Sequence, residues 1–240
     1  MFRIFEKHSD LVVGLSEKTD GQMKLVGDRP EDKIALENRK RFFNHFDIEE
    51  SRVVCANLVH GHNVVAVGAS NRGMMMVKTD GLATGERNLF LSLTVADCLP
   101  IFFHDPQKGV ISLVHAGWRS LSKAILKAAV ERLKTDFGSQ AQDILVGVGP
   151  GIGPCHFEVQ SDVLERFREF QAETLVRRDG KIFLDLKRIA QLQLLQLGLG
   201  EQNIEISLEC TFCSADRYFS ARRDKPKEIQ AMVAIIGQRE

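Results

Sequence analysis

The sequence lacks a net charge. Its 32 lysine and arginine residues balance 32 aspartate and glutamate residues, so no overall field attracts nucleic acid or an anionic membrane. It also lacks any apolar run near the roughly 20 residues of a membrane span, and its first residues contain no signal-peptide block. We therefore expect a cytoplasmic protein that binds neither nucleic acid nor membranes.

A disulfide framework and the common nucleotide-binding motifs are missing as well. Five cysteines are an odd number spread over 240 residues, and we expect them to be thiols in a reducing compartment. The glycine-containing stretch 147–154 lacks the third glycine of a dinucleotide fingerprint, and no Gly-Lys-Ser follows it. Neither a Rossmann motif nor a P-loop is present, and we interpret the stretch as a tight loop with ligand-facing amides.

No repeat, low-complexity tract or linker divides the chain, so we expect a single domain over residues 1–240. Strand-like runs and helical periodicities are interspersed, and strands adjacent in sequence favour mixed sheets. The pattern predicts an α+β fold. The expected helices are 31–46, 122–137, 161–175 and 185–197, and the expected strands are 52–59, 64–67, 74–79, 90–95, 99–103, 110–114, 144–148, 204–208, 217–220 and 229–236.

The most informative feature is a polar turn between the apolar runs 99–103 and 110–114. Pro106 stands where a type I turn favours proline, and Gly109 closes the turn. This pattern predicts a β-hairpin. Cys98 immediately precedes the first strand, and His115 follows the second, so one hairpin brings a thiol and an imidazole together.

The register of this hairpin decides how Cys98 and His115 face each other. If the strands pair symmetrically about the bond between residues 106 and 107, paired numbers sum to 213 and the two residues are directly opposite. A four-residue loop closing at Gly109 changes the sum to 215 and makes them same-face diagonal neighbours, roughly 7–8 Å apart at the backbone. An odd shift would place them on opposite faces.

Taken alone, Cys98 and His115 admit three interpretations: metal ligands, a nucleophile with its base, or a buried thiol beside an ordinary histidine. A third candidate ligand is His60, which follows an apolar run and precedes glycine. His62, two residues later, could replace it. Two imidazoles and one thiolate would leave zinc an open fourth position, which is typical of catalytic sites.

A second group of cysteines has the Cys-x-x-Cys spacing of a zinc knuckle or a redox pair. It consists of Cys210 and Cys213, and the chain has no second pair with that spacing. The adjacent residues Cys155 and His156 could complete a four-ligand site in principle. We interpret the pair as structural or incidental.

Several blocks, taken together and in order, resemble the YfiH or laccase-domain family. The resemblance covers nearly the whole chain. Its residues are Leu58-Val59-His60-Gly61, Thr94-Val95-Ala96-Asp97-Cys98-Leu99-Pro100-Ile101, His115-Ala116-Gly117-Trp118-Arg119, Gly149-Pro150-Gly151-Ile152-Gly153-Pro154-Cys155-His156-Phe157-Glu158-Val159, and Cys210-Thr211 with Phe219-Ser220-Ala221-Arg222-Arg223.

The resemblance implies a layered α/β/β/α sandwich and a mononuclear metal site with His60, Cys98 and His115 as ligands. Proteins of this family have been described as multicopper polyphenol oxidases and as purine nucleoside phosphorylases with adenosine deaminase activity. For this chain it implies a zinc enzyme, with copper as the alternative metal. Its expected reactions are phosphorolysis of adenosine, inosine and methylthioadenosine and hydrolytic deamination of adenosine. A monomer or homodimer is expected.

The chain departs from the family at a few positions. Leu58 replaces a usual glutamine, Ser120 a usual glycine and Ala221 a usual aromatic residue or histidine, and the usual Thr-Gly-Arg beyond Arg223 is missing. All three implied metal ligands are present. The departures therefore concern substrate contacts from the first strand and the tail.

Phosphorolysis requires an anion clamp for phosphate, stabilisation of a cationic sugar and a proton for the leaving base. We expect the clamp to come from Arg39, Arg119 and Arg222. We expect Asp80 and Asp97 to act as acid or base, or to orient other groups.

Two alternatives to a metal-dependent nucleoside enzyme stay open. One is a cysteine hydrolase with Cys98 as nucleophile and His115 as base. The other is a non-enzymatic, metal-dependent module that binds nucleosides without converting them. A multicopper oxidase is disfavoured, because seven scattered histidines are too few for such a centre.

Overall fold

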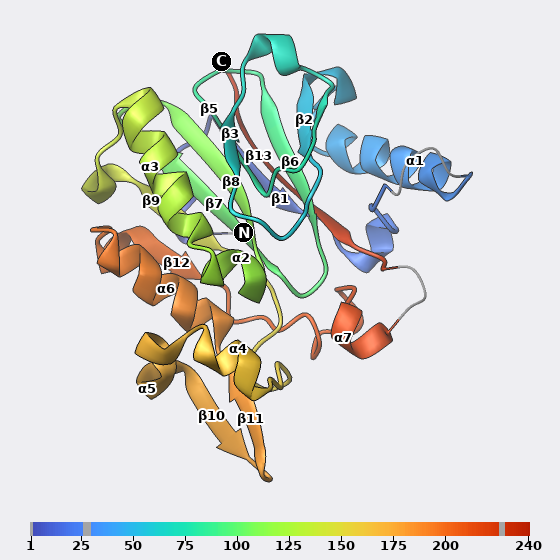
Figure 1. Ribbon diagram of the computed structural model, residues 1–240. Helices are drawn as coiled ribbons and strands as arrows, with labels where there is room; N and C mark the ends of the chain where they lie inside the picture. The colour runs from blue at the N-terminus through green and yellow to red at the C-terminus, as the bar shows by residue number, and fades with distance from the viewer. Residues whose placement is uncertain (1, 26–29, 226–228) are drawn as a thin grey trace.

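Two β-sheets packed face to face form the centre of the molecule, with helices on both outer faces (Figure 1). The structure is a computed structural model, and it describes residues 2–25, 30–225 and 229–240. The layers confirm the expected α/β/β/α sandwich.

The larger sheet has six strands in the order β12-β9-β7-β8-β5-β3. Its central pairs are antiparallel, and its outer pairs, β12 with β9 and β3 with β5, are parallel. The strands are β3 Val64–Ala66, β5 Gly81–Thr84, β7 Leu99–Asp105, β8 Val110–Ala116, β9 Leu145–Val148 and β12 Ile204–Ile206.

The smaller sheet has five strands in the order β1-β13-β6-β2-β4. β1, β13 and β6 pair antiparallel, whereas β6, β2 and β4 pair parallel. Both sheets are therefore mixed, as expected. The strands are β1 Leu11–Leu15, β2 Val53–Ala56, β4 Met75–Met76, β6 Phe90–Val95 and β13 Met232–Gln238.

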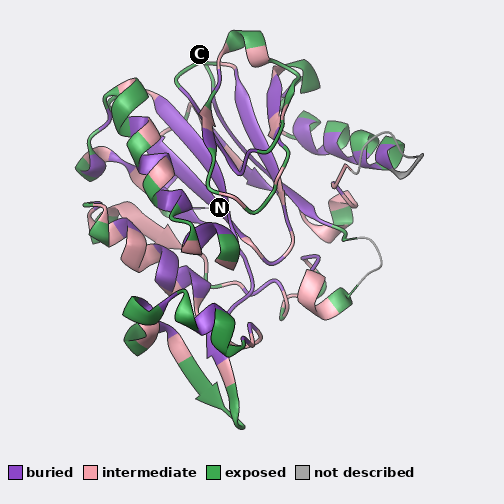
Figure 2. Cartoon of the chain, viewed as in Figure 1, coloured by how far each residue is buried: buried purple, intermediate pink, exposed green. Residues whose placement is uncertain are grey.

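Side chains alternate between two cores along the central strands. On β7, Phe102 belongs to the core between the sheets, whereas its neighbours Ile101 and Phe103 pack toward the helices. All three are fully buried, and every residue of β7 is buried, in line with the purple strands at the centre of Figure 2. Strands buried on both faces hold the functional side chains at their ends on a rigid base.

Helices cover the two outer faces because each presents one apolar stripe. The helix α1, Pro30–Asn44, packs Phe42 and Phe43 on the smaller sheet. The larger sheet is covered by α2 Trp118–Ser122, α3 Ile125–Phe137 and α6 Leu186–Gln196. The remaining α-helices and strands are α4 Ser161–Glu165, α5 Gln171–Thr174, α7 Ala221–Asp224 and the hairpin of β10 Leu175–Arg178 with β11 Lys181–Leu184.

The hairpin of β7 and β8 adopts the shifted register. Leu99 pairs with Ala116 and Asp105 with Val110, so paired numbers sum to 215; the symmetric sum of 213 is wrong. Gly109 closes the four-residue loop with a φ of 62°. The Asp105 carboxylate accepts the backbone N–H groups of Gln107 and Lys108 at 2.9 and 3.1 Å, which fixes the loop length.

Two expected elements are wrong. The helix expected over 161–175 is divided, because Phe167 leaves helical geometry (φ −127°, ψ 31°) while its side chain is buried. The strand expected over 217–220 is a turn followed by a cap. Tyr218 donates its N–H to the Ser214 carbonyl at 2.9 Å, and the Ser220 hydroxyl accepts the Arg223 N–H at 3.1 Å at the start of α7.

Within the part of the chain that the structure describes, no helix combines the length and the apolar character needed to cross a membrane.

Candidate active site

Three potential metal ligands converge at one end of the facing sheets. The ligand atoms of His60, Cys98 and His115 all lie within 4.8 Å of one another, and the two imidazole rings meet edge to face at 4.9 Å between centroids. His60 follows β2, Cys98 lies in the turn from β6 to β7, and His115 is on β8. His62, the alternative to His60, lines a different hollow beside α3.

The hairpin register explains the meeting of the thiol and the imidazole. Because Pro100 pairs with His115, Cys98 continues the ladder toward Gly117 and is a diagonal neighbour of His115. A Cβ at position 117 would lie 2.6 Å from the Cys98 sulfur. Only glycine there leaves the sulfur its place beside the two histidines.

Asp80 connects His60 and His115. It immediately precedes β5, and its side chain is fully buried. Its carboxylate accepts backbone N–H groups from Val59, His60 and Gly61 at 3.2, 2.8 and 2.7 Å. It also accepts the Nδ1–H of His115 at 3.1 Å. One carboxylate therefore holds the loop that carries His60, whose φ is 55°, and orients the His115 ring.

The charges of these groups depend on one another. Burial raises the pKa of the Cys98 thiol, but the charge and hydrogen bonds of His115 and His60 outweigh burial and lower it to about 6. Burial lowers the pKa of His115, but the Cys98 thiolate and Asp80 outweigh that effect and raise it to about 9. At neutral pH without an ion, a thiolate and an imidazolium therefore face each other.

These residues fit a divalent metal ion. A thiolate and two imidazoles are ligands that zinc and copper prefer, and three protein ligands leave a position open for substrate or water. The hydrogen bond from His115 Nδ1 to Asp80 leaves the other ring nitrogen, Nε2, for the ion. Carboxylates that hold a ligating histidine in this way are typical of metal centres.

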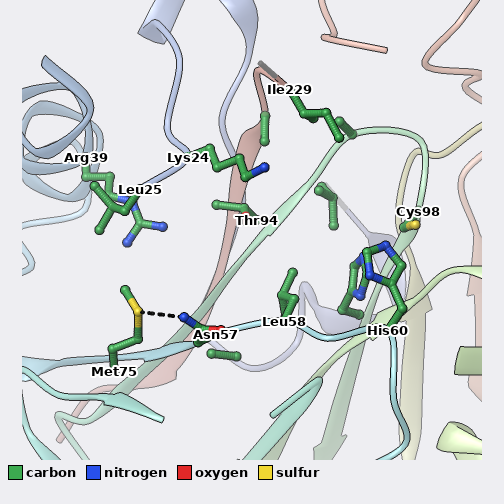
Figure 3. Close-up of a pocket in the computed structure, with 15 residues that line it drawn as sticks. Lys24, Leu25, Arg39, Asn57, Leu58, His60, Met75, Thr94, Cys98 and Ile229 are labelled. Atoms are coloured by element: carbon green, nitrogen blue, oxygen red, sulfur yellow. Dashed lines mark hydrogen bonds between the residues drawn. The ribbon is translucent and has the colours of Figure 1, made fainter. Parts of the chain in front are cut away.

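A cavity of about 320 Å³ opens beside the three ligands, at the lower end of the range of about 300–1,000 Å³ for small-molecule pockets. Figure 3 shows Arg39 across the pocket from His60 and Cys98, with the Lys24 side chain pointing into the space between. Asn57 and Thr94 add polar groups to the wall. The pocket thus combines a ligand cluster on one side with two cations on the other.

Arg39 is held in place from inside the protein. It extends from α1 with only 5% of its surface exposed. Its Nε donates to the Met23 carbonyl at 2.8 Å and its Nη1 to the Cys55 sulfur at 3.3 Å. A buried guanidinium fixed in this way is preorganised for an anion in the pocket.

The other two candidate arginines lie elsewhere. Arg119 is exposed on α2, where its guanidinium stacks 4.4 Å from the centre of the Trp118 ring. Arg222, on α7, lines a separate hollow and donates its Nη1 to the Glu158 carbonyl at 3.0 Å. Neither is among the residues that line the pocket of His60 and Cys98.

Asp97 directs its carboxylate away from the pocket. Its Oδ1 accepts the Thr211 hydroxyl at 2.6 Å, and its Oδ2 accepts the Arg222 backbone N–H at 2.7 Å. Its φ of 81° is a left-handed conformation that a non-glycine residue adopts only when its surroundings hold it. These contacts fix the backbone next to Cys98.

Sequence reasoning missed Lys24 as a pocket residue. It lies between β1 and α1, and no local motif distinguishes it from other surface lysines. In the folded structure, Arg39 on α1 donates its Nε to the carbonyl of Met23, the residue before Lys24. This contact brings the Lys24 segment to the edge of the pocket.

A family model and one named relative match nearly all of this chain, and a second relative matches part of it. The family model described as multi-copper polyphenol oxidoreductase laccase matches residues 13–239. A relative from Geobacillus stearothermophilus named purine nucleoside phosphorylase YlmD is 34% identical over 95% of this chain and 90% of its own length. A relative from an unknown prokaryote named adenosine deaminase RL5 is 34% identical over 60% of this chain and 56% of its own length.

The fold has close counterparts among solved structures. A crystal structure of the hypothetical protein YfiH from Bacillus licheniformis superposes with a TM-score of 0.89 at 28% identity, covering 95% of this chain and 93% of that one. This chain therefore shares its fold with that protein.

Proposed function

Because the chain belongs to the multi-copper polyphenol oxidoreductase laccase family, whose relatives include named purine nucleoside phosphorylases, we propose that it is a metal-dependent enzyme of purine nucleosides. Its reactions would be phosphorolysis of adenosine, inosine and methylthioadenosine and deamination of adenosine. The observation that carries the proposal is the convergence of His60, Cys98 and His115 on one wall of a pocket whose other wall holds Arg39 and Lys24.

The proposed ion is zinc, with copper as the alternative, held by His60, Cys98 and His115. When bound, such an ion supplies a positive centre that polarises a substrate oxygen or water. Asp80 orients His115 and fixes the His60 loop. Arg39 and Lys24 bind the phosphate that phosphorolysis consumes. Asp97 acts as a positioning residue for the backbone beside Cys98, through Thr211 and Arg222.

The side chains of Arg119 and Arg222, the other two expected clamp residues, lie outside the pocket lining. We keep Arg222 as an indirect contributor, since its backbone N–H holds Asp97. Arg119 could contact substrate only if the substrate also reached the surface of α2.

The proposal is tested by incubating the purified protein with adenosine and phosphate and separating the products by chromatography. We expect adenine from phosphorolysis and inosine from deamination, both dependent on Cys98. The matched control is the Cys98→Ala variant. If neither adenine nor inosine exceeds the amount formed by that control, the proposed enzyme activity is wrong. Tight adenosine binding without product would support a nucleoside-binding module instead.

Replacing Arg39 by glutamine is expected to separate the two reactions. Loss of a charge-assisted contact to phosphate should lower kcat/KM for phosphorolysis about 10- to 100-fold. Deamination consumes no phosphate, so its kcat/KM should change little. Steady-state rates at varied phosphate measure this, with Arg168→Gln as the control at an exposed arginine that pairs with Glu165 on the surface. Equal losses in both reactions would show that Arg39 supports the pocket and does not bind phosphate.

The thiolate and imidazolium pair favours one second candidate, a cysteine hydrolase with Cys98 as nucleophile and His115 as base. Metal content and alkylation separate the two candidates. If the metal-free protein stays active and iodoacetamide then inactivates it, the result would favour the hydrolase. Activity that disappears with the metal and returns with zinc would favour the metal enzyme.

A further inference from the structure

A second cluster of ligand-type residues lies outside the pocket lining, next to Thr211, whose hydroxyl donates to Asp97. It consists of Cys155, His156, Cys210 and Cys213, whose ligand atoms all lie within 4.8 Å of one another. The sulfur atoms of Cys155 and Cys213 are 3.5 Å apart, and the Cys213 sulfur is 3.3 Å from Nδ1 of His156. Three thiols and one imidazole from two distant segments thus lie close enough to share one ion.

The spacing of these donors suits a tetrahedral ion better than a disulfide. With zinc–sulfur bonds of about 2.3 Å, two sulfurs at tetrahedral angles are about 3.8 Å apart, and a sulfur and a nitrogen about 3.6 Å. The distances of 3.5 and 3.3 Å are close to those values. A disulfide needs about 2.05 Å between sulfurs, and all of these cysteines are free thiols.

The backbone around the cluster is shaped to bring the sulfurs together. The segment at Cys210 forms a parallel bridge with Gly151, and the Gly153 N–H donates to the Cys210 sulfur at 3.2 Å. A Cβ at Gly153 would lie 3.2 Å from the Cys155 sulfur and 3.4 Å from Cβ of Cys210. Glycine at this position therefore lets the two cysteines share one centre, and its amide stabilises a thiolate.

Two arginines lie beside the cluster, where their positive charge would balance the negative charge expected of the occupied site. Three thiolates, a neutral imidazole and a divalent ion sum to a net charge of about −1. Arg178 donates Nη2 to the Cys155 carbonyl at 2.8 Å, and Arg223 donates Nη1 to the Phe212 carbonyl at 2.9 Å. The His156 ring stacks on Phe212 at 3.8 Å between centroids, which fixes its orientation as outer contacts do in metal centres.

We propose that Cys155, His156, Cys210 and Cys213 bind a structural zinc ion, separate from the ion of the pocket. Four protein ligands close the coordination sphere, which is typical of a structural and not a catalytic site. The proposed ion ties the loop after β9 to the segment before α7. It goes beyond the proposed nucleoside chemistry, because none of its ligands lines the pocket of Cys98.

The position of this site connects it to the pocket. Thr211, adjacent to the ligand Cys210, donates its hydroxyl to Asp97 at 2.6 Å. Asp97 precedes Cys98, and the Ile152 N–H donates to the Asp97 carbonyl at 2.9 Å. The zinc thus fixes both segments that hold Asp97, and through Asp97 the backbone that carries Cys98.

Zinc content in paired variants tests the proposal. We expect about two zinc ions per chain in the wild type, about one in Cys98→Ala, and about none in Cys98→Ala combined with Cys213→Ser, since each ion needs its thiolates. Cys213 is exposed, so serine there should not disturb the core. The matched control is Cys98→Ala with Cys55→Ser, which should keep about one ion because Cys55 belongs to neither cluster.

A second measurement identifies the ligands even if the double variant folds poorly. Cobalt(II) added to metal-free Cys98→Ala protein should produce intense sulfur-to-metal absorption, because three thiolates coordinate it. In this Cys98→Ala background, His156→Gln should keep most of that absorption because all three thiolates remain, whereas Cys213→Ser should abolish most of it, in step with its loss of zinc.

Three outcomes would overturn the proposal. They are Cys98→Ala protein that takes up no zinc, zinc content independent of Cys213, and a Cys155–Cys213 disulfide in protein purified with reductant. Because the zinc is counted in a variant without pocket chemistry, failure of this proposal is distinct from failure of the proposed enzyme activity.

Discussion

Replacing Cys98 by alanine is expected to remove the metal ion from the pocket and to lower kcat/KM for adenosine by at least about 100-fold. The reason is that substitutions in outer contacts already cost about 10- to 100-fold, and Cys98 is itself the thiolate ligand. Its low pKa, about 6, makes it ready to bind an ion at neutral pH. Elemental analysis should show a loss of about one zinc per chain, and chromatography should show the loss of both products.

His60 and His62, two residues apart in the sequence, supply a matched comparison. His60→Ala should behave like Cys98→Ala, because its ligand atom lies within 4.8 Å of the other two. His62→Ala should keep metal and activity, because His62 lines the neighbouring hollow beside α3. If His62→Ala loses the metal and His60→Ala keeps it, the ligand assignment is wrong. If both keep it while Cys98→Ala is inactive, the thiol acts without a metal.

Replacing Asp80 by asparagine should weaken metal binding and destabilise the fold at once. The buried carboxylate accepts three backbone N–H groups and the His115 ring N–H. An amide of the same shape has one oxygen, and its own N–H groups would face those donors. We expect about a 10- to 100-fold loss of zinc affinity. The free energy of unfolding should fall by roughly 3 kcal/mol, because a buried charged partner is lost.

Chelator competition measures the zinc affinity, and urea unfolding of the metal-free protein measures the stability. The control is Asp136→Asn on the surface of α3, where the ion pair with Arg132 at 2.9 Å should contribute less than about 1 kcal/mol. Asp80→Asn protein with unchanged resistance to chelator would show that Asp80 supports only the fold. Unchanged stability together with weak zinc binding would show that Asp80 only orients the metal ligands and does not stabilise the fold.

The hairpin illustrates how far local sequence can specify a site. Pro106 and Gly109 indicated the turn, and the four-residue alternative placed Cys98 and His115 as diagonal neighbours, as the structure has them. What the residues could not decide was the choice between that register and the symmetric one. Asp105, which accepts two loop N–H groups, makes that choice through side-chain geometry.

The roles of the charged residues depended on contacts far apart in sequence. The sequence predicts Arg222 as a clamp residue and Asp97 as an acid, base or orienting group; in the fold, Asp97 accepts the Arg222 backbone N–H from a segment 125 residues away. Lys24 carries no motif, and the fold alone brings it to the pocket of Cys98. Such placements follow from sheet order and from how loops pack, which single residues do not encode locally.

The amino-acid sequence by itself determined the chemical inventory of this protein: a thiol and an imidazole on one hairpin, a histidine after an apolar strand, and a Cys-x-x-Cys pair. Turn residues and strand periodicity act over a few residues, so the sequence also specified that hairpin. The family resemblance implied His60, but the residues taken alone left His62 open, and only the tertiary structure decided between them. It also decided that Cys155 and His156 meet Cys210 and Cys213. The physical reason is that these meetings depend on two sheets packing face to face, and that packing is set by the buried residues of the whole chain.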